Sequence, residues 1–440
     1  MENKKILMLI LPEIGHINPM LCIARDLVDK HHEVVFYGLS HQKELIEKSG
    51  AQFKQYLYQN YSNRLNCLQK DPTNNMLSLL MSLIDVSYKE VPRLAQEVQN
   101  MQPDLIIFDN VSLPAKYLIK YIQKRTNKIP KYIQFFTLFP SIKSVYPSPE
   151  LLKKICVVPS GFMFNIQKKW LNLKQRLITS YLGIEYSNPL DLSTFPCDLN
   201  IVTIMPGLHP FENSFNSSFK FLGCCLSERI RKSIIEPKLS DQFTLFPKIN
   251  PRKDAQNEES DQKLVYVSLG TVFYNNVFVF DTIIEAFRRI NNKNFKVVIS
   301  VGGENVKLYE ERGKNGTFLM PENVLVVGFA PQIDLLERAS MFITHCGMNS
   351  TSEAIHYGVP IIAIPIKADQ PRVAYRVCDE LKLGIRFNPL MLEIESLANG
   401  ITQVLTDRSY LYRMLEYSKK SHCHNGIESS VKLIEDYLKR

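Results

Sequence analysis

Residues 341–353 combine an apolar run, a short glycine-containing loop and the start of a helix. The apolar run 341–344 is typical of a buried strand, and polar residues with helical spacing follow the loop. The first backbone N–H groups of a helix lack intrahelical acceptors, and the helix dipole adds positive potential there. A diphosphate can bind at such a place, where Gly347 permits close backbone approach and His345 can donate a hydrogen bond.

The same helix start has a second explanation that requires no ligand. Ser350 and Glu353 fit the S-x-x-E capping box, in which both side chains satisfy backbone N–H groups. The flanking segments favour the ligand hypothesis, because small and polar residues recur on both sides of the loop. They are Gly328–Gln332 upstream, and Gly358–Pro360 and Ala368–Gln370 downstream.

The order Pro-Gln, His-Cys-Gly, Asn-Ser, Glu, Gly-Val-Pro, Asp-Gln over residues 331–370 resembles the donor signature of family-1 UDP-dependent glycosyltransferases. That family has the GT-B fold, in which two Rossmann-like domains face each other across a cleft. The resemblance implies a UDP-sugar as co-substrate and no separate cofactor. The implied contacts are Phe329 and Gln332 for the base and ribose, Glu353 for the ribose hydroxyls, His345, Gly347, Asn349 and Ser350 for the diphosphate, and Asp369 and Gln370 for the sugar.

Three details refine this resemblance. Ser268 and Thr271 match the family's small-residue turn near the phosphates, although a simple strand-end turn would also explain them. Phe329 stands where plant members have tryptophan, and the interval to His345 is two residues shorter than in plant and animal members. The spacing is therefore similar to that of the bacterial macrolide-type branch. Gln370 ends the signature as in relatives that use glucose, so UDP-glucose is the expected donor.

A histidine follows the first predicted strand, in the segment Gly15–Pro19. A lone loop histidine is often structural, but the carboxyl ends of strands in doubly wound sheets are where ligands bind. The segment resembles the family's Gly-His-x-x-Pro, in which the histidine removes the acceptor proton. Such a base works better beside a carboxylate. Asp109, at the end of the predicted strand 105–108, is the candidate partner, and Asp104, at its start, is the alternative.

These residues predict an inverting transfer of a sugar to a hydroxyl of a small lipophilic acceptor. An aromatic-rich stretch would supply the acceptor wall, although an ordinary packed insertion explains it equally well: Phe135, Phe136, Phe139, Phe162, Phe164 and Trp170. Two other hypotheses are a UDP-sugar epimerase and a non-catalytic binding protein of the same fold. The histidine loop with its carboxylate partner argues against the first, and the complete donor set argues against the second.

No metal site is expected. The chain has no Asp-x-Asp motif, so the helix start and His345 would stabilise the leaving UDP. The cluster 422–424, His-Cys-His, lacks a fourth ligand and the usual zinc spacing. Nine cysteines without a CxxC pair suggest reduced thiols and a cytoplasmic protein.

Strands alternate with helices in two halves, which predicts two doubly wound parallel sheets in the α/β class. The expected division is 1–224 as the acceptor-binding domain, 225–262 as linker, 263–408 as the UDP-sugar-binding domain, and 409–440 as C-terminal helices that could pack back on the first domain. The net charge of +9 is spread along the chain, so no nucleic-acid partner is expected. Neither a signal peptide nor a membrane anchor is expected, because no apolar run reaches about 18 residues.

Overall fold

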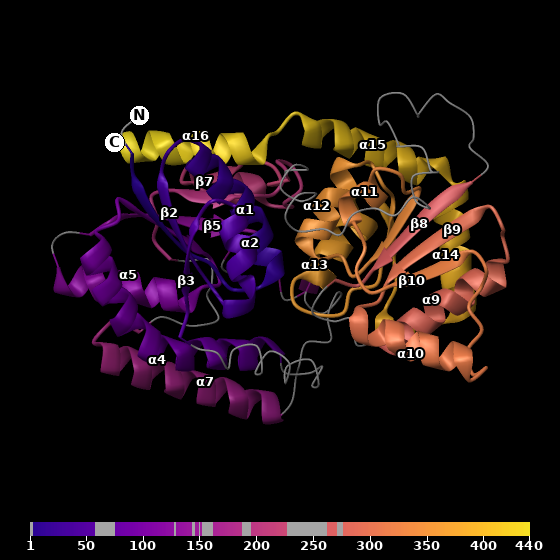
Figure 1. The fold of residues 1–440 in the computed structure, drawn as a ribbon, viewed down its shortest axis with the longest axis horizontal. Helices are drawn as coiled ribbons and strands as arrows, with labels where there is room; N and C mark the ends of the chain where they lie inside the picture. The colour runs from indigo at the N-terminus through magenta and orange to yellow at the C-terminus, as the bar shows by residue number, and fades with distance from the viewer. Residues whose placement is uncertain are drawn as a thin grey trace. The chain divides into compact units, whose positions relative to one another are not determined.

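The computed structural model describes residues 3–57, 75–126, 129–142, 146–148, 150–151, 162–186, 195–226, 262–270 and 276–440. The predicted linker 225–262 lies almost wholly outside these ranges. The chain divides into two compact units. Met1–Leu226 and Asn425–Arg440 form the first unit, and Ser227–His424 form the second (Figure 1).

The first unit contains a seven-stranded parallel sheet in the order β3-β2-β1-β4-β5-β6-β7. Its strands are β1 Lys5–Leu9, β2 Glu33–Gly38, β3 Gln52–Gln55, β4 Leu105–Asp109, β5 Lys131–Phe136, β6 Asn200–Val202 and β7 Phe219–Phe221. Its main helices are α1 Ile14–Asp29, α2 Lys43–Lys48, α4 Asn75–Met101, α5 Leu113–Arg125, α7 Phe162–Leu182 and α16 Gly426–Lys439.

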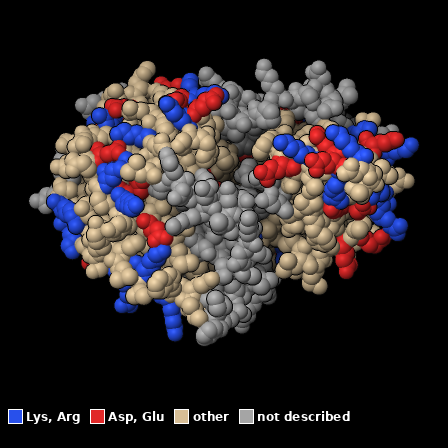
Figure 2. Space-filling view, turned by 60° about the horizontal axis from the view of Figure 1, so that its bottom comes forward, with Lys and Arg blue, Asp and Glu red and all other residues tan. Residues whose placement is uncertain are grey.

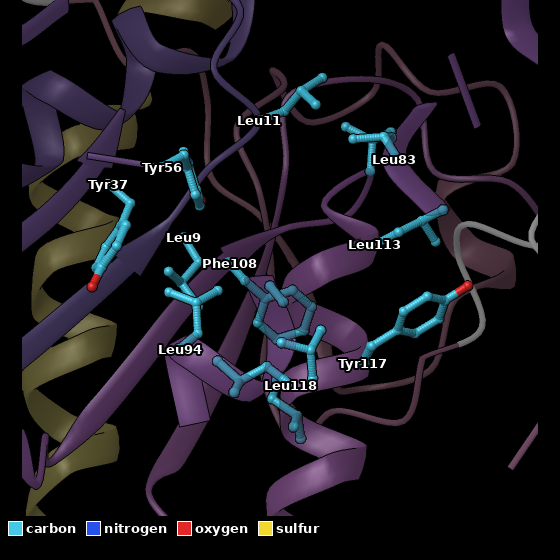
Figure 3. Packing of buried hydrophobic residues seen from close by; sticks show 14 of the residues in the cluster. Leu9, Leu11, Tyr37, Tyr56, Leu83, Leu94, Phe108, Leu113, Tyr117 and Leu118 are labelled. Atoms are coloured by element: carbon cyan, nitrogen blue, oxygen red, sulfur yellow. The ribbon is translucent and has the colours of Figure 1, made fainter. Parts of the chain in front are cut away.

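Apolar side chains of the first sheet are buried on both faces, as expected for parallel strands covered by helices. On one face, Leu9 of β1 and Phe108 of β4 pack with Leu94 of α4 and Leu118 of α5 (Figure 3). Successive strand residues point to opposite faces, so Met8 is buried on the other side. The continuous apolar runs in the sequence therefore correspond to central strands.

The second unit repeats this architecture with six parallel strands in the order β10-β9-β8-β11-β12-β13. They are β8 Lys263–Ser268, β9 Phe295–Ser300, β10 Val324–Val327, β11 Met341–Thr344, β12 Ile361–Ala363 and β13 Gly384–Arg386. Its helices include α9 Val277–Ile290, α10 Gly303–Lys314, α11 Gln332–Leu336, α12 Met348–His356, α13 Gln370–Ala374, α14 Ile394–Thr406 and α15 Arg408–His422. The α/β prediction is confirmed for both halves.

Helix α1 begins earlier than the sequence suggested. The sequence places His16 in a loop, and this prediction is wrong, because the backbone N–H groups of His16 and Ile17 both donate to the Glu13 carbonyl and begin the helix. Pro19 stands inside the helix, although its ring nitrogen has no hydrogen to donate to the preceding turn. His16 therefore lies in the first turn of a helix rather than in a loop.

The last helix returns to the first unit. Helix α16 packs on α1, and Glu435 accepts a hydrogen bond of 2.6 Å from Lys30. In the last turn of α16, the Lys131 ammonium donates to the carbonyls of Tyr437 and Leu438. A cation on the last carbonyls of a helix also complements the helix dipole. Residues 425–440 are thus integrated into the first unit by packing and by charge.

Charged side chains are interspersed over the surface. On the face in Figure 2, Lys and Arg lie among Asp and Glu, with uncharged residues between them. No helix among the described residues is long and apolar enough to cross a bilayer.

The start of α16 gives a test of its docking. A Cβ added at Gly426 would collide with the carbonyl oxygen of Gly223 and lie 2.6 Å from that of Cys224. Gly426→Ala should therefore lower the free energy of unfolding by about 1–3 kcal/mol, the usual cost of overpacking. Urea unfolding followed by the fluorescence of Trp170, the single tryptophan, reports on this unit. Lys432→Ala, on the exposed face of the same helix, should change little, and equal stabilities for both variants would contradict the tight contact.

Candidate active site

The strand order of the first unit reverses between β1 and β4. From β1 the chain moves outward to β2 and β3, and then returns to place β4 on the other side of β1. Ligands of open α/β sheets bind at the carboxyl ends of the strands at such a reversal. His16 follows β1, Asp109 ends β4 and Thr137 follows β5, so all three lie at this edge.

The side chains of His16 and Asp109 are hydrogen bonded, through His16 Nδ1 and Asp109 Oδ2. Asp109 is 1% exposed and its other oxygen accepts from the backbone N–H of Val111 at 2.8 Å, which fixes the carboxylate. Because a carboxylate only accepts, Nδ1 carries the proton, and Nε2 is the basic nitrogen of the neutral ring. The alternative Asp104 lies at the opposite end of β4, bonded to the backbone N–H of Lys5.

Two further groups surround His16 that the sequence analysis did not single out. The hydroxyl of Thr137 lies 3.0 Å from His16 Nδ1. Burial raises the pKa of Glu13 to about 7, although the charge of His16 lowers it. Glu13 directly precedes α1, so a second acid–base group adjoins the histidine. The strand-end rule that selected Asp109 would also have selected Thr137, whereas the shifted pKa of Glu13 has no signal in the sequence.

The predicted acceptor aromatics do not share one environment. Phe135, Phe136 and Phe139 are buried, and Phe139 packs edge-on against His209 and Tyr146. Trp170 lies on α7 and is 56% exposed. The side chains of Phe162 and Phe164 lie outside the described residues. The four described side chains therefore do not form one exposed wall, and their contact with an acceptor stays a prediction.

In the second unit, the strand order reverses between β8 and β11, and Ser268 pairs with Thr344 at the carboxyl ends of these strands. His345 follows directly, between two close glycines. A Cβ added at Gly270 or Gly347 would lie 2.7 or 2.6 Å from the imidazole ring. Only glycine leaves room for this ring in its present place. The small-residue turn after β8 and the loop after β11 are thus one local site.

Burial lowers the pKa of His345 to about 4, although a hydrogen bond with the backbone of Ser268 raises it. The imidazole is therefore neutral at pH 7 and has a single N–H, which can donate either to the Ser268 carbonyl or to a bound anion. Cys346, next along the chain, is buried with φ 61, a left-handed conformation that turns the backbone sharply into α12. The loop thus directs the helix start to the edge where His345 lies.

The capping-box explanation of Ser350 and Glu353 is wrong. Helix α12 begins at Met348 with Gly347 at its N-cap, and no side chain caps it. Ser350 is therefore the third helical residue. Glu353 is instead bonded to the side-chain amide of Gln332, the first residue of α11.

Gln332 contacts several of the residues that are predicted to bind the UDP-sugar. Its amide nitrogen also lies 3.4 Å from the Ser350 hydroxyl, and its carbonyl oxygen accepts from Tyr266 at 3.3 Å. Tyr266 itself is stacked on Phe342, with ring centroids 4.9 Å apart. The structure therefore brings Gln332, Ser350 and Glu353 into one hydrogen-bonded group beside the start of α12.

The remaining predicted donor residues have different surroundings. Gln370 is buried, and its side-chain oxygen accepts from the backbone N–H groups of Ile366 and Lys367, which fixes the orientation of the side chain. Asp369 lies at the N-cap of α13 and Asn349 in the first turn of α12. Phe329 is exposed in the loop after β10, and Thr271 lies outside the described residues.

Within the described residues, no group of three His, Cys, Asp or Glu side chains has an arrangement suited to a metal ion. His422 donates from Nδ1 to the Ser418 carbonyl and stacks on His356, with ring centroids 4.1 Å apart. The His-Cys-His segment therefore has structural contacts within α12 and α15.

Known proteins with the same organisation are glycosyltransferases. The family described as "UDP-glucoronosyl and UDP-glucosyl transferase" matches residues 253–428. The chain is 27% identical over 440 residues to "NDP-glycosyltransferase YjiC" of Bacillus subtilis, covering 100% of this chain and 99% of that protein. It is 24% identical over 415 residues to "Demethyllactenocin mycarosyltransferase" of Streptomyces fradiae, covering 90% and 78%.

A solved structure described as the "Glycotransferase of kitacinnamycin" superposes over 100% of both chains, with a TM-score of 0.76 and 20% identity. This likeness shows the GT-B fold. Together with the family match and the full-length relatives, it shows that the chain is a nucleotide-sugar-dependent glycosyltransferase, an enzyme that transfers a sugar to an acceptor, and that it is similar to the family-1 enzymes.

Proposed function

We propose that this enzyme transfers glucose from UDP-glucose to a hydroxyl of a small lipophilic acceptor, with inversion at the anomeric carbon. The observation that carries the proposal is the hydrogen bond between His16 and the buried carboxylate of Asp109. A histidine held in this way has a defined tautomer and a basic Nε2. That is the group needed to take a proton from a hydroxyl.

In the proposed reaction, Nε2 of His16 accepts the acceptor proton while the acceptor oxygen forms a bond to the anomeric carbon. The bond from that carbon to the diphosphate breaks in the same displacement, and UDP takes the electron pair. One displacement converts an α-linked donor into a β-linked glycoside. Asp109 stabilises the imidazolium that forms.

On the donor side, Glu353 would accept hydrogen bonds from the ribose hydroxyls, with Gln332 beside it. His345 and the backbone N–H groups at the start of α12 would stabilise the negative charge that grows on the diphosphate. Asp369 and the Gln370 amide nitrogen would bind the sugar hydroxyls. Gln370 is the basis for naming glucose, and a panel of UDP-sugars tests that choice directly.

His16→Ala should reduce transfer to hydroxyl acceptors by about 10²- to 10⁴-fold, the usual contribution of a general base. UDP affinity, measured by calorimetry, should stay within error because the variant leaves the donor residues intact. Asp109→Ala should lose less activity, since it acts through the histidine. His424→Ala, which alters an exposed histidine, is the matched control, and near-normal turnover of His16→Ala would refute the assigned base.

Glu353→Gln should weaken UDP binding by about 10- to 100-fold, the range expected for losing hydrogen bonds to a charged acceptor. The sharper measurement uses 2′,3′-dideoxy-UDP, which lacks the ribose hydroxyls and should bind both proteins equally. Glu395→Gln, an exposed ion-paired residue on α14, is the control. An equal loss for both nucleotides would assign Glu353 a structural role instead.

Turnover of UDP-glucose with a phenolic acceptor should be unchanged by EDTA, because neutral donors are proposed to balance the diphosphate charge. UDP release and glycoside formation are measured together. A strict manganese requirement would overturn this part of the mechanism. Epimerised UDP-sugar without glycoside, or binding without any product, would replace the transfer hypothesis by the epimerase or the binding protein.

A further inference from the structure

Helix α7 has apolar residues on two opposite faces. Its inner face packs against α4 and contributes Leu171, Ile178 and Leu182 to the core of the first unit. Its other face carries large apolar side chains that are each between 42% and 61% exposed: Ile166, Trp170, Leu173, Leu177 and Tyr181. Figure 1 shows α7 lying alongside α4 at the outer side of this unit.

The five exposed residues form one continuous stripe, which we call the outer stripe. At about 100° per residue they fall within an arc of about 80°, on the side away from the buried residues. From residue 166 to residue 181 the stripe is about 22 Å long, at 1.5 Å per residue. Tyr88 of α4, also exposed, packs on Tyr181 with ring centroids 4.4 Å apart and so widens the stripe. Scattered apolar residues are ordinary on surfaces, but a contiguous patch indicates an interaction site.

The charged side chains that α7 itself carries are all of one sign. Helix α7 contains Lys168, Lys169, Lys174 and Arg176, and no Asp or Glu. Lys169 and Arg176 follow one edge of the stripe, at helical positions about 80–100° from its centre. Lys174 follows the other edge and is paired with Asp85 of α4 at 2.6 Å. A second copy docked through the same stripe would bring these cations together, so the charge pattern disfavours self-association.

We propose that the outer stripe of α7 docks on an anionic lipid surface. A helix lying in the membrane interface has an apolar face with Trp, Leu or Phe and flanking Lys or Arg that contact acidic headgroups. The outer stripe supplies both features, and Trp and Tyr are the side chains enriched at the headgroup level. Such a helix lies on the bilayer rather than crossing it. The proposal does not depend on the acceptor or the donor sugar.

The chain contains its own probe, because Trp170 in the stripe is the only tryptophan. The protein is mixed, without substrates, with vesicles of phosphatidylcholine alone or with about one third phosphatidylglycerol. Anionic vesicles should shift the Trp170 emission to the blue, and lipids brominated on their acyl chains should quench it. Added salt should weaken the binding, since the attraction to acidic headgroups is screened. Pure phosphatidylcholine should give a much smaller change.

Two matched double variants test whether vesicle binding requires the outer stripe or any pair of exposed apolar residues. Leu173→Glu with Leu177→Glu should abolish binding to anionic vesicles while keeping Trp170. Leu390→Glu with Met391→Glu makes the same change at two residues of the second unit that are each 77% exposed, and should leave binding intact. Lys169→Gln with Arg176→Gln should weaken binding at least tenfold. Circular dichroism and thermal unfolding check that all variants are folded.

The proposal is overturned if anionic vesicles give no blue shift, or if both glutamate pairs affect binding equally. Light scattering of the protein without vesicles tests the competing occupant. The protein could form a dimer that the Leu173 and Leu177 substitutions dissociate, and show no vesicle binding. This result would assign the stripe to a second copy and would also overturn the proposal.

Discussion

Parallel pairing of β1 with β4 and of β8 with β11 is the constraint on which both sites depend. Each pair joins strands that are distant in sequence. The carboxyl ends of the two strands lie side by side, and the helices that follow them run to opposite faces of the sheet. His16 and Asp109 meet at the first reversal although 93 residues separate them. His345 meets the turn at Gly270 at the second. The reactive residues are thus placed by sheet order, with loops adding only the final orientation.

The sites at the two reversals of strand order differ in the charge that they can stabilise. In the first unit a buried carboxylate can compensate a proton taken up by His16, so the pair tolerates a transient positive charge. In the second unit, burial keeps His345 neutral, and the groups offered to an anion are backbone N–H, imidazole and amide donors. Neutral donors avoid the desolvation cost of a buried cation and need no change of protonation when the ligand leaves.

Much of this arrangement could be predicted from the sequence. The apolar runs predict the central strands. His16 and Asp109 stand at the carboxyl ends of two of them, which is enough to predict that these residues pair. Two helix starts are predicted wrongly, because a proline and an apparent capping residue suggest later starts. Helix α1 begins before Pro19, and α12 begins before Ser350. Helix α4, with Pro92 inside it, was not anticipated at all. The pairing of Glu353 with Gln332 and the raised pKa of Glu13 depend on burial, which local patterns do not encode.

Helix α7 shows that the spacing of apolar residues alone does not predict which faces of a helix are buried. Its apolar residues recur on both sides of the helix, and the aromatic-rich stretch that contains it predicts either an acceptor wall including Trp170 or an ordinary packed insertion. Packing on α4 covers only the face of Leu171 and Ile178. The opposite face remains apolar, although replacing it with polar residues would disturb no core contact. Such a stripe on a folded unit implies an apolar environment elsewhere, and the basic residues that α7 places along its borders favour an anionic one.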